Sequence, residues 1–285
     1  MWDAGRVPWV PELFTAPVLQ KLLDQRRRDS LVAVPYFDGL MAGNPDALVE
    51  SFWGEPELHD PVRGRVSGVR AFEAFMTETS DWLAQHNARV EDVEHVILER
   101  RGFEEVILHL DGEAGPVELP VAVVADRAPD RRIEELRIYF SGWPLSGRHA
   151  NRPPVRQPDP ELRLSDVVAA YHRALATGDV EAILATFQAD GYVREPAGGR
   201  YVHKGPDGLR AFYEESFSNG GGIPLEHCTV IDDGRACALE YNVVRWGTTR
   251  LPPQAGFAAY VRSDSGKLAA ARIYDDMDRP LAARR

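Results

Sequence analysis

The chain has 285 residues, of which 44% are hydrophobic and 27% charged, a composition typical of a soluble globular protein. Its 33 basic and 44 acidic residues give a formal net charge of −11 at pH 7, which disfavours nucleic acid and membrane surfaces as partners. No window approaches the ~18 apolar residues of a membrane span, and the first twenty residues lack the basic start and apolar core of a secretory signal. The sequence therefore predicts a cytoplasmic protein.

From the N-terminus, the first predicted element is a helix over residues 15–28, with Thr15 as N-cap and three arginines at its end. We assign it to an N-terminal helical extension over residues 1–29. A first domain follows over residues 30–145. Its predicted strands are 93–98, 103–110, 117–126 and 133–140.

Five prolines between residues 141 and 165 resist helix formation and favour an extended connector. We place a proline-rich linker at 146–164 and a second domain at 165–281. In the second domain we predict a helix from Ser165 to Gly178, helices over 180–187 and 208–217, and strands over 227–231, 236–246, 256–262 and 268–275.

The chain contains one internal repeat, at a spacing of 135 residues. Residues 36–52 align with residues 171–187 without a gap. At the same spacing, the aspartate of an Asp-Pro pair, Asp60, aligns with the glutamate of a Glu-Pro pair, Glu195. The repeat predicts two α+β domains, each with three helices on a curved antiparallel sheet that can enclose a pocket.

A first helix ending in Ala-Gly-Asn or Thr-Gly-Asp, a second ending in Phe, and an acidic residue before Pro resemble the nuclear transport factor 2-like superfamily. Within it, the pattern is most similar to ketosteroid isomerases and SnoaL-like cyclases, over residues 30–145 and 165–280. The resemblance implies two tandem cone-shaped domains packed sheet against sheet as a pseudo-twofold internal dimer. The chain could then be monomeric. The fold alone does not fix the activity.

The ketosteroid isomerase pattern implies catalytic roles for two pairs of residues. Tyr36 and Tyr171 stand where the first helix carries the oxyanion donor, and Asp60 and Glu195 stand where the carboxylate base precedes Pro. In the second copy Tyr213 stands where a further tyrosine supports the donor. From the residues alone, an alternative stays open: the Asp-Pro and Glu-Pro pairs are turn residues and the tyrosines fill the core.

One departure from that pattern concerns the penultimate strand. Where the isomerases place a protonated aspartic acid as second oxyanion donor, this sequence has Val123 in the first copy and Ala258 in the second. Half of the implied oxyanion hole is therefore missing.

Strand alternation gives further candidate substrate-binding residues. If the pocket lies on the face that the resemblance suggests, His109 faces inward with Glu105 and Ile107, while Val106 packs outward. His109 could then approach the proposed base. We place Tyr241 at the equivalent position of the second copy.

The end of the last strand differs between the copies. Asp275 takes the position that Phe140 holds in the first copy. An inward Asp275 would form a carboxylate pair with Glu195, suited to opening an epoxide. The run Asp-Asp-Met-Asp instead favours a solvent-exposed exit loop for Asp275.

The predicted function is acid/base catalysis on a hydrophobic small molecule, either ketosteroid isomerase-like isomerisation or polyketide-type cyclisation, without cofactor or metal. Two alternatives stay open. One is an epoxide hydrolase, an epoxide-opening cyclase or a dehydratase on the same fold. The other is a binding protein in which one or both pockets carry no turnover.

Overall fold

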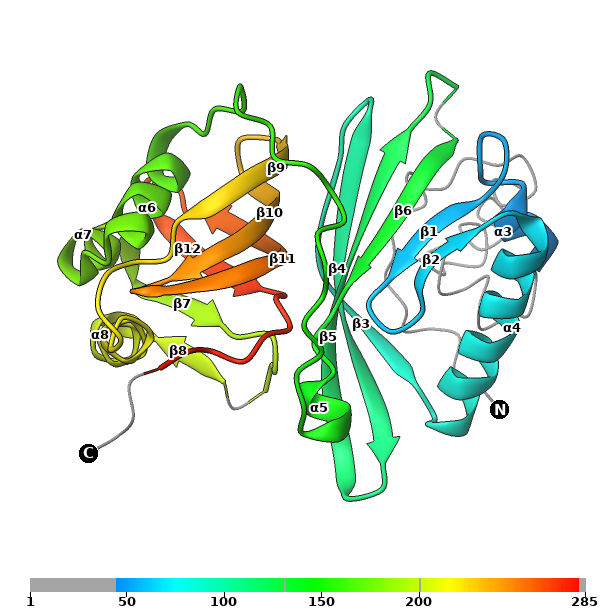
Figure 1. Ribbon diagram of the computed structural model, residues 1–285, viewed down its shortest axis with the longest axis horizontal. Helices are drawn as coiled ribbons and strands as arrows, with labels where there is room; N and C mark the ends of the chain where they lie inside the picture. Colours follow the sequence, from blue (N-terminus) through cyan, green and yellow to red (C-terminus); the bar gives the residue numbers. More distant parts are fainter. Residues whose placement is uncertain (1–44, 131, 200, 282–285) are drawn as a thin grey trace. The chain divides into compact units, whose positions relative to one another are not determined.

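The computed structural model describes residues 45–130, 132–199 and 201–281. The chain divides into two compact units, Met1–Phe140 and Ser141–Arg285 (Figure 1). Tyr36 and the predicted N-terminal extension lie outside the described residues. Within the described ranges, no helix is long and apolar enough to cross a membrane.

The first unit forms one sheet with strand order β2-β1-β6-β5-β4-β3, packed against helices. Its described elements are α3 (Pro45–Val49), β1 (Glu57–Asp60), β2 (Gly64–Ser67), α4 (Val69–Gln85), β3 (Arg89–Ile97), β4 (Arg101–Gly112), β5 (Gly115–Arg127) and β6 (Ile133–Tyr139).

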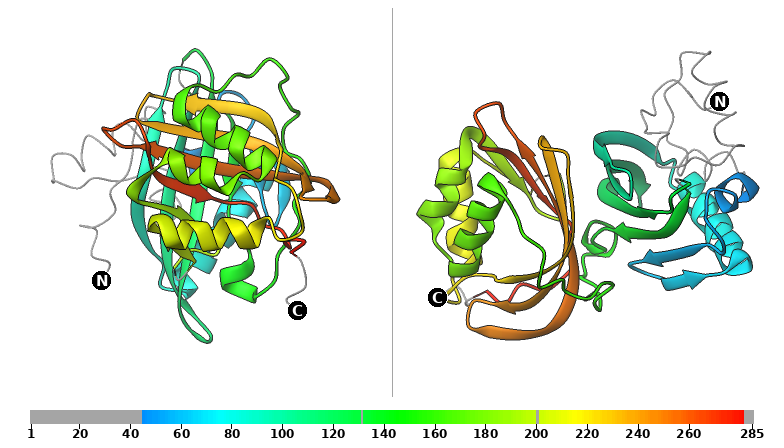
Figure 2. Two further views of the ribbon diagram at one scale, coloured as in Figure 1. Left: turned by 90° about the vertical axis from the view of Figure 1, so that its left-hand side faces the viewer. Right: turned by 90° about the horizontal axis from the view of Figure 1, so that it is seen from above.

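The second unit repeats the same strand order as β8-β7-β12-β11-β10-β9, so the predicted repeat of one α+β fold is confirmed. Its elements are α5 (Trp143–Ser146), α6 (Asp166–Thr177), α7 (Val180–Thr186), β7 (Phe187–Arg194), β8 (Val202–Lys204), α8 (Gly205–Ser216), β9 (Leu225–Asp232), β10 (Ala236–Trp246), β11 (Thr249–Arg262) and β12 (Leu268–Ile273). Helices α6, α7 and α8 cover the concave face of this sheet (Figure 2).

The predicted α+β fold is confirmed, but each sheet contains one parallel pair of strands in addition to the predicted antiparallel ones. Strand β1 pairs in parallel with β6, and β7 pairs in parallel with β12, so both sheets are mixed. The short strands β1, β2, β7 and β8 were not predicted. Each parallel pair joins the beginning of a unit to its end, and such a long-range pairing leaves no local turn signal in the sequence.

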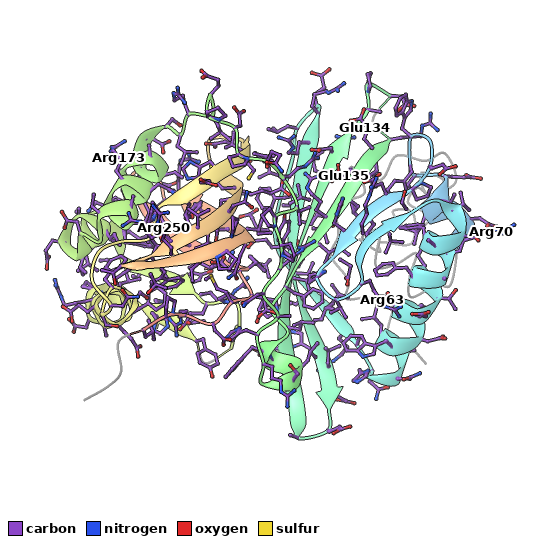
Figure 3. All side chains as sticks on the ribbon, viewed as in Figure 1. Arg63, Arg70, Glu134, Glu135, Arg173 and Arg250 are labelled. Atoms are coloured by element: carbon purple, nitrogen blue, oxygen red, sulfur yellow. The ribbon has the colours of Figure 1, made fainter. Side chains whose placement is uncertain are left out.

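Helix α6 shows how the spacing of apolar residues places side chains in the core of the second unit. Val168, Tyr171 and Leu175 recur at helical spacing and are buried in the core, whereas Arg173 is exposed on the opposite side (Figure 3). Gly178 ends the helix at a φ of 75°, a left-handed conformation that favours glycine. The predicted first helix of this copy is thus confirmed.

The proline-rich stretch between the two repeats is not extended throughout, contrary to the prediction. Helix α5 forms there, with Pro144 in its first turn. A proline at that position costs no hydrogen bond, because the first turn of a helix has no internal partner for its N–H groups.

Candidate functional site

A cavity of about 200 Å³ lies in the second unit, between the helices and the inner face of the sheet. Most of its wall is aromatic or aliphatic. Its lining includes five tyrosines and two carboxylates: Tyr171, Tyr201, Tyr213, Tyr241, Tyr260, Glu195 and Asp275. The sequence analysis named all of these residues except Tyr201 and Tyr260.

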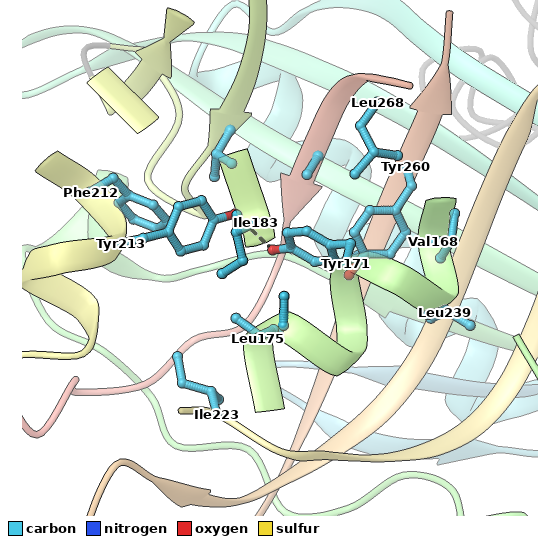
Figure 4. Close-up of a cluster of buried hydrophobic side chains, with 14 of the residues drawn as sticks. Val168, Tyr171, Leu175, Ile183, Phe212, Tyr213, Ile223, Leu239, Tyr260 and Leu268 are labelled. Atoms are coloured by element: carbon cyan, nitrogen blue, oxygen red, sulfur yellow. Dashed lines mark hydrogen bonds between the residues drawn. The ribbon is translucent and has the colours of Figure 1, made fainter. Parts of the chain in front are cut away.

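Two buried tyrosines, from α6 and α8, form a hydrogen-bonded pair in the wall of this cavity. The hydroxyl oxygens of Tyr171 and Tyr213 lie 2.8 Å apart (Figure 4). Burial raises the pKa of both phenols, so both remain protonated at neutral pH. If the Tyr213 hydroxyl donates to Tyr171, the Tyr171 proton is available to an oxygen atom of a ligand.

Asp275 lies two residues beyond β12 and lines the cavity. The expectation of a solvent-exposed exit loop is wrong for this residue. Its Oδ1 accepts a hydrogen bond from the Tyr241 hydroxyl. Burial raises the pKa of Asp275 to about 6, although the bond from Tyr241 opposes that rise. A carboxyl group with this pKa can both accept and release a proton near neutral pH.

Tyr241 reaches this position because of a glycine on the neighbouring strand. Gly256 is its cross-strand partner, and a Cβ added there would lie 2.3 Å from the Tyr241 ring. No side chain fits between the ring and the β11 backbone. The pairing of Tyr241 with Gly256 therefore makes room for the ring that binds Asp275.

Glu195 also lines the cavity, within a polar cluster. Its Oε1 lies 2.6 Å from Nε2 of His203, and its Oε2 lies 3.2 Å from Nη2 of Arg279. The His203 ring stacks on Phe212, with ring centroids 4.6 Å apart. The structure thus places Glu195 beside the cavity with two basic partners.

Part of the cavity wall comes from the segment before α6, where Trp143 and His149 stack on each other. Asp276 holds this segment. Its carboxylate accepts hydrogen bonds from the Ser141 hydroxyl and the Gly142 N–H, and it lies 2.8 Å from His149 Nδ1. Asp276, the neighbour of Asp275, therefore holds in place the segment that contributes Trp143 and His149 to the cavity wall.

In the first unit, Asp60 is buried at the end of β1. Its Oδ1 accepts hydrogen bonds of 2.8 Å from the N–H groups of Val62 and Arg63. This carboxylate caps the turn between β1 and β2, as the turn alternative in the sequence predicts.

The predicted orientation of strand β4 is wrong. Val106, Leu108 and Leu110 belong to the core, so His109 faces the opposite side of the sheet. There His109 Nε2 lies 2.7 Å from Glu91 on β3. His109 therefore takes no part in an inner pocket with Asp60.

The predicted equivalence of His109 and Tyr241 is also wrong. Val123 pairs with Glu104 in the first unit, and Ala258 pairs with Leu239 in the second. Tyr241 therefore matches Val106, at the same spacing of 135 residues as the rest of the repeat. By that spacing Tyr260 matches Ala125 and Asp275 matches Phe140, which packs against the core of the first unit.

Among the described residues, only the second unit therefore combines tyrosines and an inner carboxylate at these positions. Tyr260 was missed by the sequence reasoning, although its counterpart in the repeat is the much smaller Ala125. Its ring centroid lies 5.4 Å from that of Tyr171. Within the described ranges, no group of three or more His, Cys, Asp or Glu residues could hold a metal ion.

Comparison with known proteins identifies the fold of the second unit. The model of the SnoaL-like domain family matches residues 168–271. None of the curated proteins matches the chain in sequence.

Several solved structures are similar to part of the chain. A candidate polyketide cyclase from Sinorhizobium meliloti is 21% identical, covering 39% of this chain and 94% of its own, with a TM-score of 0.33. SalBIII, an epoxide hydrolase/cyclase-like enzyme of pyran ring formation in salinomycin, is 19% identical, with coverages of 40% and 90% and a TM-score of 0.34. An NTF2-like protein of unknown function from Cytophaga hutchinsonii is 16% identical, with coverages of 41% and 94% and a TM-score of 0.32.

Proposed function

Because residues 168–271 match the model of the SnoaL-like domain family, we propose that the cavity of the second unit catalyses acid/base proton transfer on an apolar small molecule, without a cofactor. The reaction is an isomerisation or cyclisation through an enolate. The observation that carries this proposal is the position of Asp275, a carboxyl group with a pKa of about 6 on the wall of a largely apolar cavity.

In this mechanism the Asp275 carboxylate removes a proton from a carbon next to a substrate carbonyl group. The electron pair of the broken C–H bond moves to the carbonyl oxygen, which becomes the enolate oxygen. Tyr171 donates a hydrogen bond to this oxygen, while the Tyr213 hydroxyl donates to Tyr171. In an isomerisation, the protonated Asp275 then returns its proton to another carbon. In a cyclisation, the enolate carbon attacks a second carbonyl group, whose oxygen becomes an alkoxide and takes up the proton from Asp275, which closes the ring and restores the carboxylate.

This assignment moves the base from Glu195, the residue implied by the family resemblance, to Asp275. Both oxygens of the Glu195 carboxylate are already engaged, Oε1 with His203 and Oε2 with Arg279. Asp275 has Tyr241 as its side-chain partner and remains able to take up a proton near pH 6.

A second candidate function is the opening of an epoxide, which the presence of two carboxyl groups on one cavity favours. Protonated Asp275 would donate its proton to the epoxide oxygen, and Glu195 would accept the proton of the attacking hydroxyl group or water. This reaction needs both carboxyl groups, whereas the enolate reaction needs Asp275 alone.

The test is an assay of the purified protein on a panel of enones, polyketide-like ketones and epoxides, with ligand binding measured in parallel. Asp275→Asn is compared with the control Asp278→Asn, which changes an exposed carboxylate outside the cavity lining. Loss of turnover with retained binding in Asp275→Asn alone supports the proposal. If the wild type binds members of the panel but converts none of them, the protein is a binding protein and the proposal fails.

A further inference from the structure

His149 is held on the wall of the cavity by two neighbouring side chains. Its Nδ1 lies 2.8 Å from Oδ1 of Asp276, and its ring stacks on that of Trp143 with ring centroids 4.7 Å apart. These contacts cover Nδ1 and one face of the ring. Since His149 lines the cavity and 22% of its side chain stays accessible, the accessible part is the other face and the edge that carries Nε2.

Asp276 determines which nitrogen of His149 carries the proton. Its carboxylate also accepts hydrogen bonds from the Ser141 hydroxyl and from the N–H groups of Gly142 and Ala150. Burial opposes ionisation, but these hydrogen bonds together with that of His149 hold the pKa of Asp276 below its usual range. An ionised carboxylate only accepts hydrogen bonds, so the neutral His149 ring carries its proton on Nδ1 and a lone pair on Nε2.

Nε2 of His149 is a hydrogen-bond acceptor without a partner among the described residues. It belongs to the same wall as Asp275, which directly precedes Asp276 in the chain. A ligand group that donates a hydrogen bond suits this nitrogen, whereas a carbonyl or ether oxygen, which only accepts, does not. Because the cavity wall is mostly aromatic or aliphatic, an uncharged hydroxyl group is favoured over an ammonium group.

We propose that Nε2 of His149 binds a hydroxyl group of the substrate. The inference rests on the proposed function, which places the reacting carbonyl group at Tyr171 and Asp275. The substrate class is therefore an apolar hydroxy ketone, with its carbonyl group at the reacting end and its hydroxyl group against His149. Asp276 is a positioning residue, because it acts on the substrate only through His149.

The first experiment compares two probes of the same shape, 4-(hydroxymethyl)acetophenone and 4-ethylacetophenone, in which a methyl group replaces the hydroxyl group. Calorimetry gives their dissociation constants for the wild type and for His149→Phe, which keeps an aromatic ring beside Trp143. The control is His95→Phe, the same substitution at an exposed histidine of β3. The preference of the wild type for the hydroxymethyl probe should fall roughly three- to tenfold in His149→Phe, the effect of one lost hydrogen bond, and stay unchanged in His95→Phe.

The second experiment needs no ligand. Nitrogen NMR of the imidazole rings at neutral pH shows which nitrogen carries the proton, and the His149 signals are assigned by their loss in His149→Phe. The wild type should carry the proton on Nδ1. In Asp276→Asn the proton should move to Nε2. The reason is that the Gly142 and Ala150 N–H groups, which bind Oδ2, hold the asparagine oxygen there and place its NH2 group against Nδ1.

Three results overturn the inference. They are an unchanged preference in His149→Phe, a proton on Nε2 of His149 in the wild type, and the failure of both probes to bind the wild type at millimolar concentration. Because neither readout requires turnover, a failure of the proposed proton transfer is detected separately in the assay of Asp275→Asn.

Discussion

The Tyr241 hydroxyl donates a hydrogen bond to the carboxyl group of Asp275. The first unit has Val106 and Phe140 at the matching positions, and both pack with its core. At these two positions the first repeat therefore has apolar side chains packed with its core, whereas the second has an ionisable group beside a cavity. This difference leads to the following predictions.

The raised pKa of Asp275 predicts a pH-dependent stability. The folded protein holds this proton up to about pH 6, whereas the unfolded chain loses it near pH 4, so stability falls as the pH rises through this window. In Asp275→Asn this loss is absent. Relative to the wild type, the variant should gain up to about 3 kcal/mol in free energy of unfolding between pH 4 and pH 7.5.

Urea denaturation at both pH values measures this difference, with Asp278→Asn as the control at an exposed carboxylate. If the difference in free energy of unfolding between the wild type and Asp275→Asn does not change with pH, the pKa of Asp275 is not raised in the folded protein.

The tyrosine pair predicts unequal effects of two similar substitutions. Tyr171→Phe removes the proposed donor to the enolate and should lower kcat about 10²-fold or more. Tyr213→Phe leaves the donor in place but removes the partner that lies 2.8 Å away, so its effect should be roughly tenfold. Steady-state kinetics of both variants show which substitution lowers kcat more. A larger decrease in Tyr213→Phe would contradict the assigned roles.

The close packing of Gly256 against the Tyr241 ring predicts that substitutions at these two positions have coupled effects on stability. Gly256→Ala places a methyl group against the Tyr241 ring and should destabilise the protein by about 1–3 kcal/mol. The first unit combines Val106 with Val121 at the matching positions, so Tyr241→Val should relieve the clash. Thermal unfolding of the two single variants and the double variant gives the coupling energy. If the effects of the two substitutions on the free energy of unfolding are additive, the contact with the Tyr241 ring is not the cause of the destabilisation by Gly256→Ala.

Glu195→Gln separates the two candidate reactions. If Asp275 alone transfers the proton, this substitution should change kcat by less than tenfold, because the amide keeps the shape of the side chain. Epoxide opening needs the Glu195 carboxylate as a proton acceptor and should lose activity about 10²-fold or more. The measurement is kcat on ketone and epoxide substrates in parallel.

Much of the fold could be predicted from the sequence, because the repeat shows the same pattern of turn residues and apolar spacing twice. The helix that ends at Gly178 and the long hairpin strands of both copies follow from turn residues and periodicity. The parallel pairing of β7 with β12 could not be predicted in this way, since it joins segments about 80 residues apart. The packing of the two units through their sheets stays a prediction.

The candidate site was predicted in part. Tyr171 and Tyr213 follow from the family pattern, and their hydrogen bond confirms their proximity. Asp275 was named but placed in solvent, because its acidic neighbours resemble an exposed loop. Its neighbour Asp276 in fact binds the segment around His149. The orientation of His109 was wrong because one strand carries apolar residues on both faces, so alternation alone did not fix which face is the inner one.

The pH dependence of kcat/KM on a converted substrate tests the central claim, that Asp275 transfers the proton. The account predicts that kcat/KM rises with pH through an apparent pKa of about 6 and then levels off, as the Asp275 carboxylate forms. In Asp275→Asn the rate should fall about 10²-fold or more and lose this dependence, while Asp278→Asn keeps both. Wild-type activity and pH profile retained in Asp275→Asn would contradict the account.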